Sequence, residues 1–339
     1  MLKVLYTPLS WLYATCVYIR HFLFDKHVLP SFTVDVPTIC VGNLAVGGTG
    51  KTPMTEYLLR LLLANGYRPA VLSRGYKRRT SGFVMADSHA TVETVGDEMM
   101  QLHRAFPAVP MAVCEHRVRG VRQLMRQVKE PDVVVLDDAM QHRTLRCGFT
   151  ILLTAYDKLY IDDRMLPLGT LRDLPSRALA ADAVVVTKCP ETILPIDMRV
   201  VDNRLHLPTF QQLHFAGIEY APPEQEGTPL VLCGIAHPEY LMDHVQQRSP
   251  HAHLMAYPDH HRYTKRDVAK IVEKARHYDY VLTTEKDWQR LQSTTLEEQL
   301  QAQGKRLVAM PIRTRFCTPQ ADFDKQIITY VRENTKKSK

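Results

Sequence analysis

Short, predominantly apolar runs recur along the N-terminal part of the chain, and each ends in a polar or glycine-rich segment. The clearest runs are 36–41, 69–72 and 133–136, and further runs lie at 110–113, 149–153 and 183–187. Strands that are apolar throughout are typical of a parallel sheet covered by helices on both faces. The pattern predicts an α/β fold with such a sheet.

A second alternation of apolar runs and helical patterns spans 229–311, with a helix opening near Thr264. This pattern predicts a second, smaller α/β lobe with its own sheet. Pro222 and Pro223, followed by polar residues, mark a hinge. We therefore expect three parts: an N-terminal helix at 1–30, a larger core at 31–222, and a smaller C-terminal lobe at 223–339 that closes over the core.

The N-terminus has an uncharged stretch at 4–19 with cationic residues on both sides. Thr7 can cap a helix that has Pro8 at its first position and runs over 8–24. The stretch is shorter than the ~20 apolar residues that span a bilayer. Two alternatives remain: an interfacial helix and a helix packed on the core. Three aromatic residues suit a lipid headgroup region: Trp11, Tyr13 and Tyr18.

Composition is that of a soluble globular protein, because 45% of the 339 residues are hydrophobic and 23% are charged. Disorder, collagen and coiled coil are excluded. The formal charge of +7 favours an anionic partner without choosing among phosphate, lipid and nucleic acid. Seven cysteines without ligand spacing indicate reduced thiols in a cytosolic compartment.

The run 36–41 leads into a glycine-rich segment that ends in Gly50-Lys51-Thr52 and is followed by a helical pattern. Strand, glycine loop and helix in this order are typical of the phosphate-binding loop of P-loop NTPases. Lys51 is expected to reach the β and γ phosphates, and Thr52 to bind Mg²⁺. Ala45 stands where the first glycine of the motif is usual. We expect the nucleotide phosphates to contact Gly47, Gly48, Thr49, Gly50, Lys51 and Thr52.

Acidic and basic residues follow two other strands of the predicted core. The run 133–136 ends in Asp137 and Asp138, and apolar residues closing on acids are typical of a strand that serves Mg²⁺. The run 183–187 continues into Lys188-Cys189-Pro190, where guanine-binding proteins carry an aspartate instead of Pro190. Without that carboxylate, guanine loses its main hydrogen bonds, so ATP is favoured over GTP.

Several strings, taken together, resemble one family. GNLAVGGTGKTP, SRGY at 73–76, VGDE at 95–98, DDAMQH, LRD at 171–173, GIAHP, PDHHRY at 258–263 and TEKD at 284–287 occur in this order. The chain resembles the tetraacyldisaccharide 4'-kinases of lipid A biosynthesis. It departs from the family at Ala139-Met140, where Gly-Phe is usual, and at Asp173, where Glu is usual.

The resemblance implies ATP- and Mg²⁺-dependent phosphorylation of the 4'-hydroxyl of a tetraacylated glucosamine disaccharide 1-phosphate. It also implies an N-terminal membrane-associating helix and a peripheral or monotopic location at the cytoplasmic face of the bacterial inner membrane. The anionic membrane surface and the lipid-linked disaccharide are then the partners. No nucleic acid and no obligate protein partner are inferred.

The resemblance also implies roles for individual residues. Asp97 pairs with a histidine of the PDHHRY string, for which His260 is the first choice and His261 the second. Arg172 neutralises the transferring phosphate, and Asp173 lies near the metal together with Thr52, Asp137 and Asp138. The expected substrate-binding residues are Arg117, Asn43, Ser73 and Arg74; for Arg117 the alternative is a solvated helix face.

Two other functions compete with the kinase. One is a soluble P-loop GTPase that acts in metallocentre assembly or as a regulatory switch, since such proteins share the loop. This chain, however, has Pro190 where a GTPase is expected to have an aspartate, and a GTPase function gives no reason for the paired histidines. A nucleic-acid motor needs clustered basic and aromatic residues, and the sequence has no such cluster.

Overall fold

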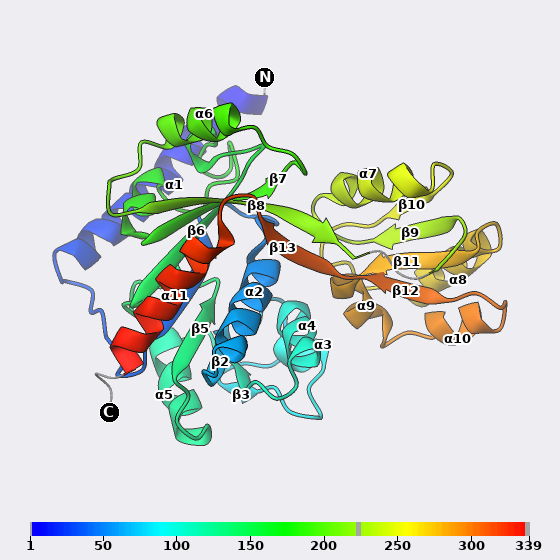
Figure 1. The fold of residues 1–339 in the computed structure, drawn as a ribbon, viewed down its shortest axis with the longest axis horizontal. Coiled ribbons are helices and arrows are strands. Elements are labelled where there is room, and N and C mark those ends of the chain that lie inside the picture. The colour runs from blue at the N-terminus through cyan, green and yellow to red at the C-terminus, as the bar shows by residue number, and fades with distance from the viewer. Residues whose placement is uncertain (1, 222–224, 336–339) are drawn as a thin grey trace.

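The computed structural model describes residues 2–221 and 225–335, which form a larger and a smaller lobe, each built on its own sheet (Figure 1). The larger sheet has nine strands in the order β13-β8-β7-β6-β1-β5-β2-β4-β3. The inner strands are parallel, whereas β13 and β3 pair antiparallel at the two edges. The strands are β1 (Thr38–Asn43), β2 (Pro69–Ser73), β3 (Val84–Met85), β4 (Met111–Val113), β5 (Val133–Asp137), β6 (Phe149–Ala155), β7 (Ala183–Cys189), β8 (Gln212–Tyr220) and β13 (Ile312–Phe316). The predicted parallel sheet is confirmed.

Helices cover both faces of this sheet, because alternate side chains of the apolar strands point to opposite faces and each set needs a cover. On one face, α2, α4 and α11 complete one apolar cluster, and on the other face α1, α5 and α6 complete a second. These helices are α1 (Leu2–Asp25), α2 (Lys51–Ala64), α4 (Asp97–Ala105), α5 (Arg117–Gln127), α6 (Pro195–Leu205) and α11 (Gln320–Thr335). Short turns complete the core at α3 (Val92–Val95), η1 (Tyr160–Asp162) and η2 (Pro175–Ala180).

The smaller lobe is a four-stranded parallel sheet in the order β10-β9-β11-β12, with apolar clusters on both faces. Its strands are β9 (Pro229–Cys233), β10 (His253–Ala256), β11 (Tyr280–Thr284) and β12 (Leu307–Met310). Its helices are α7 (Pro238–Arg248), α8 (Lys265–Ala275), α9 (Glu285–Leu291) and α10 (Leu296–Gln301). Thr264 caps α8 in a reciprocal capping box with Asp267, which confirms the predicted helix start.

The predicted boundary of the C-terminal lobe, 223–339, is wrong at its C-terminal end. After β12 the chain returns to the larger sheet, where β13 pairs with β8 and α11 buries Phe323, Ile327 and Val331. Apolar periodicity predicts that such segments are packed, but it does not say on which sheet. The predicted hinge at Pro222 and Pro223 lies outside the described residues.

The N-terminal helix packs on the core and also exposes apolar side chains. It begins at Leu2 rather than at Pro8, so the predicted start is wrong; Pro8 lies inside the helix and removes one of its backbone hydrogen bonds. Ser10, His21 and Phe24 are buried. Further apolar residues of the same helix lie at the surface: Leu9, Trp11, Leu12, Tyr18, Ile19 and Phe22. Over the described ranges, no helix is long and apolar enough to cross a membrane.

Candidate active site

The glycine loop between β1 and α2 has a backbone that only its glycines allow. Gly47 and Gly50 have φ values of 110° and 85°, in the left-handed region. A Cβ on Gly47 or Gly48 would meet nothing within 4 Å, so this stretch of backbone is open to a ligand. Ala45 has no such conformation, and its segment is anchored by a hydrogen bond from Val46 N to Thr170 O (2.7 Å). The loop therefore tolerates alanine at the position where the motif usually has its first glycine.

A network of charged and polar groups surrounds the end of this loop. Asn43 Nδ2 donates to Thr49 Oγ1 (2.7 Å), and Asn43 Oδ1 accepts from Arg172 Nη2 (2.6 Å) and from Lys51 Nζ (3.5 Å). Arg172 Nη1 also donates to Asp138 Oδ2 (2.9 Å). Burial opposes ionisation of Asp138, but the cations of Lys51 and Arg172 outweigh it and lower its pKa to about 2. Two cations are thus held beside the loop, where phosphate charge would be neutralised.

Asp137 has the properties of a metal ligand. It is 2% exposed; Oδ2 accepts from Ser73 Oγ (3.1 Å), whereas Oδ1 is buried and finds no hydrogen-bond partner in the described part of the chain. Burial, together with the nearby charges of Glu98 and Asp138, raises its pKa to about 7. A divalent cation would relieve this cost, and Thr52 in the first turn of α2 would offer it a hydroxyl. The residues therefore fit Mg²⁺.

Two residues lie where their predicted roles do not fit. Asp173, expected near the metal, is buried and accepts instead from His21 of α1 and from Leu174 N. Arg117, expected to bind substrate, is 1% exposed and donates to the carbonyl oxygens of Cys114, Asp137 and Asp138. Both side chains are committed to the protein interior. Arg117 therefore holds the backbone of Asp137 and Asp138.

Asp97 and His260 meet at the boundary between the lobes. Asp97 begins α4 of the larger lobe, and His260 lies in the segment between β10 and α8 of the smaller one. His260 Nδ1 lies 2.8 Å from Asp97 Oδ2. His260 has a left-handed backbone (φ 61°), and its ring packs edge-on against Tyr76, with centroids 5.2 Å apart. His261 turns away and contacts Asp267 of its own lobe (3.1 Å). The predicted contact between Asp97 and His260 is present.

Two basic residues of α9 complete this contact, and sequence reasoning did not single them out. Arg290 donates to Asp97 through both Nε (2.9 Å) and Nη2, and through Nη1 to Asp287 Oδ1 (2.8 Å). Burial opposes ionisation of Asp97, but His260 and Arg290 hold its pKa well below the usual range. Lys286 Nζ lies 3.3 Å from His260 Nε2. Lys286 belongs to the TEKD string, and Arg290 lies one helical turn further on, which was the available signal.

Lys286 also lies close to an acidic residue at the start of α4. Lys286 Nζ lies 3.7 Å from Glu98 Oε1. The negative charge of Glu98 raises the pKa of Asp137, and the positive charge of Lys51 lowers it. The charge of Glu98 therefore acts both on Lys286 of the interlobe contact and on Asp137 near the loop.

The remaining predicted residues flank the loop. Ser73 supports Asp137, and the Arg74 side chain is exposed beside it. Thr187 Oγ1 donates to Thr49 O (2.9 Å), so the Lys188-Cys189-Pro190 segment starts beside the glycine loop. Asn43 is fully buried and organises the loop from within.

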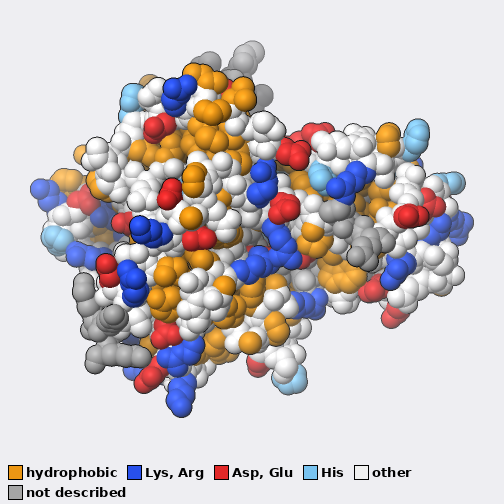
Figure 2. Space-filling view, viewed as in Figure 1, with side chains coloured by type: hydrophobic (Ala, Val, Ile, Leu, Met, Phe, Trp, Pro, Cys, Tyr) orange, Lys and Arg blue, Asp and Glu red, His pale blue; other side chains and the backbone are white. Residues whose placement is uncertain are grey.

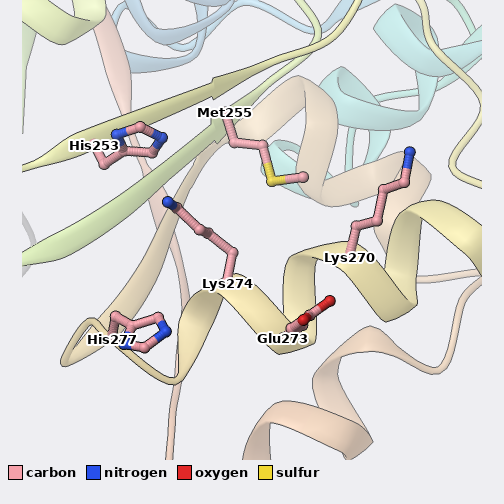
Figure 3. A pocket seen from close by; sticks show the side chains of 6 residues that line it. All are labelled: His253, Met255, Lys270, Glu273, Lys274 and His277. Atoms are coloured by element: carbon pink, nitrogen blue, oxygen red, sulfur yellow. The ribbon is translucent and has the colours of Figure 1, made fainter.

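Two surface hollows lie elsewhere. One, of about 360 Å³, is formed by α8 and β10 of the smaller lobe and includes His253, Lys270 and Lys274 (Figure 3). The other, of about 700 Å³, lies between β8 and the start of α11 and includes His214 and Asp322. None of the residues predicted for the active site lines either hollow.

Comparison with known proteins identifies the family of this chain. A family model described as Tetraacyldisaccharide-1-P 4'-kinase matches residues 2–332. A tetraacyldisaccharide 4'-kinase of Flavobacterium johnsoniae is 42% identical, with 98% of each chain covered. One of Bacteroides thetaiotaomicron is 41% identical, with 98% of this chain and 94% of the relative covered. The crystal structure of "apo" form LpxK from Aquifex aeolicus in complex with ATP has a TM-score of 0.74 and 25% identity, covering 98% of this chain and 99% of that one. The chain therefore belongs to the tetraacyldisaccharide 4'-kinase family.

Proposed function

We propose that this protein transfers the γ-phosphoryl group of ATP to the 4'-hydroxyl of a tetraacylated glucosamine disaccharide 1-phosphate in lipid A biosynthesis. The observation that carries the proposal is the pairing of His260 with Asp97 beside a phosphate loop. A phosphate loop alone serves many reactions. A histidine held by a carboxylate adds a group that accepts the proton of an attacking hydroxyl.

The phosphate end of the reaction is served by the larger lobe. Backbone N–H groups of the glycine loop and the start of α2 bind the phosphates of ATP. Lys51 and Arg172 neutralise the charge that spreads over the transferring group. Asp137 and Thr52 would hold Mg²⁺, which would withdraw negative charge from the phosphate groups.

The acceptor end is served by the contact between the lobes. Because Asp97 stays ionised, it accepts the Nδ1 hydrogen of His260 and fixes the ring in the tautomer with an unprotonated Nε2. In our proposal Nε2 takes the sugar hydroxyl proton as the oxygen attacks the γ-phosphorus, the bond from that phosphorus to the β–γ bridging oxygen breaks, and ADP leaves. Asp97 then stabilises the imidazolium that forms, and Arg290 keeps Asp97 in place.

The direct test is a reaction of the purified protein with ATP, Mg²⁺ and the lipid disaccharide 1-phosphate in detergent micelles. We expect a product heavier by one phosphoryl group, and none from Lys51→Ala. Absence of that product from wild-type protein that still binds ATP would overturn the proposed function.

We also propose that the protein acts at the cytoplasmic face of the inner membrane, as a peripheral or monotopic protein. The outer face of α1 exposes Trp11 (70%) and Leu12 (63%), and α6, which covers the same face of the sheet, exposes Ile196 and Val200. Figure 2 shows apolar side chains gathered over α6. Apolar side chains on two helices of one layer suit insertion among lipid headgroups.

Vesicle sedimentation tests this location. Trp11→Ser with Leu12→Ser is expected to reduce binding to vesicles that contain anionic phospholipid and to leave the unfolding temperature unchanged, because neither side chain is buried. A control pair is Thr294→Ala with Thr295→Ala, which lies in the smaller lobe. Equal binding by the Trp11/Leu12 variant and wild type would exclude α1 as the contact.

A further inference from the structure

The N-terminal helix reaches the active-site segment through buried polar groups. His21 Nε2 of α1 lies 2.5 Å from Asp173 Oδ1, and both side chains are at most 5% exposed. Arg143 Nη1, 3.2 Å from His21 Nδ1, can only donate, so Nδ1 accepts and Nε2 carries the hydrogen given to Asp173. This buried hydrogen bond ties α1 to the residue that directly follows Arg172.

Two more contacts lead from α1 to the same place. Tyr13 OH donates to the Arg172 carbonyl oxygen (3.0 Å). Arg20 Nη2 donates to Gln141 O (3.0 Å), and Gln141 Nε2 donates to Asn43 O (2.6 Å). The helix thus holds the backbone of both Arg172 and Asn43, whose side chains are hydrogen-bonded to each other.

The backbone of Arg172 is fixed from two sides. Its N–H donates to Leu44 O (2.8 Å), at the start of the glycine loop, and its carbonyl accepts from Tyr13 of α1. With both ends of the residue held, the direction in which the guanidinium leaves the backbone is set. Misplacement of a catalytic group by about 1 Å can cost on the order of a hundredfold in rate.

We infer that α1 is a positioning element of the active site, in which His21 and Tyr13 act through Asp173 and the Arg172 carbonyl to hold the Arg172 guanidinium on Asp138 and Asn43. The inference rests on the proposed kinase function, which assigns Arg172 to the transferring phosphate. It gives α1 a role in turnover that does not depend on a membrane. His21 and Tyr13 are positioning residues, since they act through Asp173 and the Arg172 carbonyl.

The test measures turnover in detergent micelles, where no bilayer is present. His21→Ala is expected to lower kcat about tenfold and to change the KM for ATP less than about threefold. His21→Gln, whose side-chain N–H can still donate to Asp173, is expected to restore most of the kcat. In an Arg172→Ala background, His21→Ala is expected to have almost no further effect, because the group through which it acts is gone.

A gentler variant covers the case in which His21→Ala does not fold. Tyr13→Phe removes only the hydroxyl that holds the Arg172 carbonyl, and we expect a measurable fall in kcat. Thr15→Val is the matched control, because the Thr15 hydroxyl bonds only within its own helix, to Trp11 O. Hydrogen exchange of segment 164–174 should be faster in Tyr13→Phe than in Thr15→Val.

The outcomes separate the inference from the proposed function. Equal fold losses from His21→Ala with and without Arg172, or unchanged kcat and exchange in Tyr13→Phe, would overturn the positioning role. Wild-type protein without turnover would overturn the kinase function instead, and the exchange measurement would still decide whether α1 holds the segment.

Discussion

The phosphate-loop region and the interlobe contact differ in how the chain assembles them. The first is built by one continuous stretch, 43–52, together with the end of β5 and the Arg172 segment. The second joins Asp97 of one lobe to His260 and Arg290 of the other. The loop region follows from local strand, turn and helix geometry, whereas the interlobe contact exists only when the two lobes dock.

The two regions also differ in their charge balance. Beside the loop, Asp137 keeps a buried oxygen without a partner in the described structure, and its pKa is raised. In the interlobe contact Asp97 is fully engaged, and its pKa is lowered. A site whose buried charge is not compensated within the protein is suited to bind a charged ligand, whereas a site whose buried charges are paired holds its side chains in one arrangement. We expect variants in the first region to weaken ligand binding or turnover without lowering the stability of the ligand-free protein, and variants in the second to lower stability as well as rate.

The largest effect is expected from Lys51→Ala. Removing an ammonium that stabilises charge on the transferring phosphate should lower kcat about a thousandfold, or ~4 kcal/mol, with the fold intact. Steady-state kinetics measures this, with Lys270→Ala on the surface of α8 as control. Retention of more than about a tenth of wild-type kcat would remove the loop from the mechanism.

Arg290→Ala should show that the interlobe contact carries stability. The change leaves Asp97 buried without its arginine partner, which costs about 3 kcal/mol of the free energy of unfolding. Urea denaturation measures this, and Arg262→Ala, an exposed arginine of the same lobe, is the control. If the two variants were equally stable, the contact would not hold the lobes together.

Asp137→Asn should have the opposite effect on stability in the absence of Mg²⁺. Because the folded pKa is raised to about 7, the carboxyl group favours folding only while it is protonated, and that advantage is lost as pH rises from about 4 to 7. At pH 8 in EDTA the variant is expected to be about 2 kcal/mol more stable than wild type, and at pH 4 equally stable. Thermal unfolding at both pH values measures the difference, and a destabilised variant at pH 8 would contradict the unbalanced site.

The smallest effect is expected for nucleotide choice. Pro190 offers no carboxylate to guanine, so ATP should be preferred over GTP as donor by about tenfold or more. Competition between the two nucleotides in one reaction measures the ratio. A preference for GTP would favour the alternative of a soluble P-loop GTPase that acts as a switch, and would contradict the assignment of the loop region to an ATP-dependent kinase reaction.

The sequence predicted the loop region better than the interlobe contact, for physical reasons. The backbone around Gly50, Lys51 and Thr52 takes a shape that neighbouring residues determine, so the motif was sufficient to predict that shape. The approach of Asp97 to His260 depends on how two sheets dock, which periodicity does not encode; that pair came from family resemblance.

Features that depend on packing were missed, or differ from the contacts that the sequence suggested. Arg117 and Asp173 are charged residues close to motif residues, which suggested ligand contacts, but burial commits both to the interior. Arg290 was overlooked because an arginine on a helix is usually solvated, and only the docked lobes bury it. The return of β13 to the larger sheet was missed because the apolar pattern of a strand carries no information about its partner.

The central claim is that Asp97 and His260 act across the lobe boundary as one proton-accepting unit, and a double-mutant cycle on kcat tests it most directly. With ATP and lipid disaccharide saturating, Asp97→Ala and His260→Ala should each lower kcat strongly, and the double variant should be little worse than the poorer single one. His261→Ala should be mild. Strictly multiplicative losses in the double variant would show that the two residues act independently and would contradict the account.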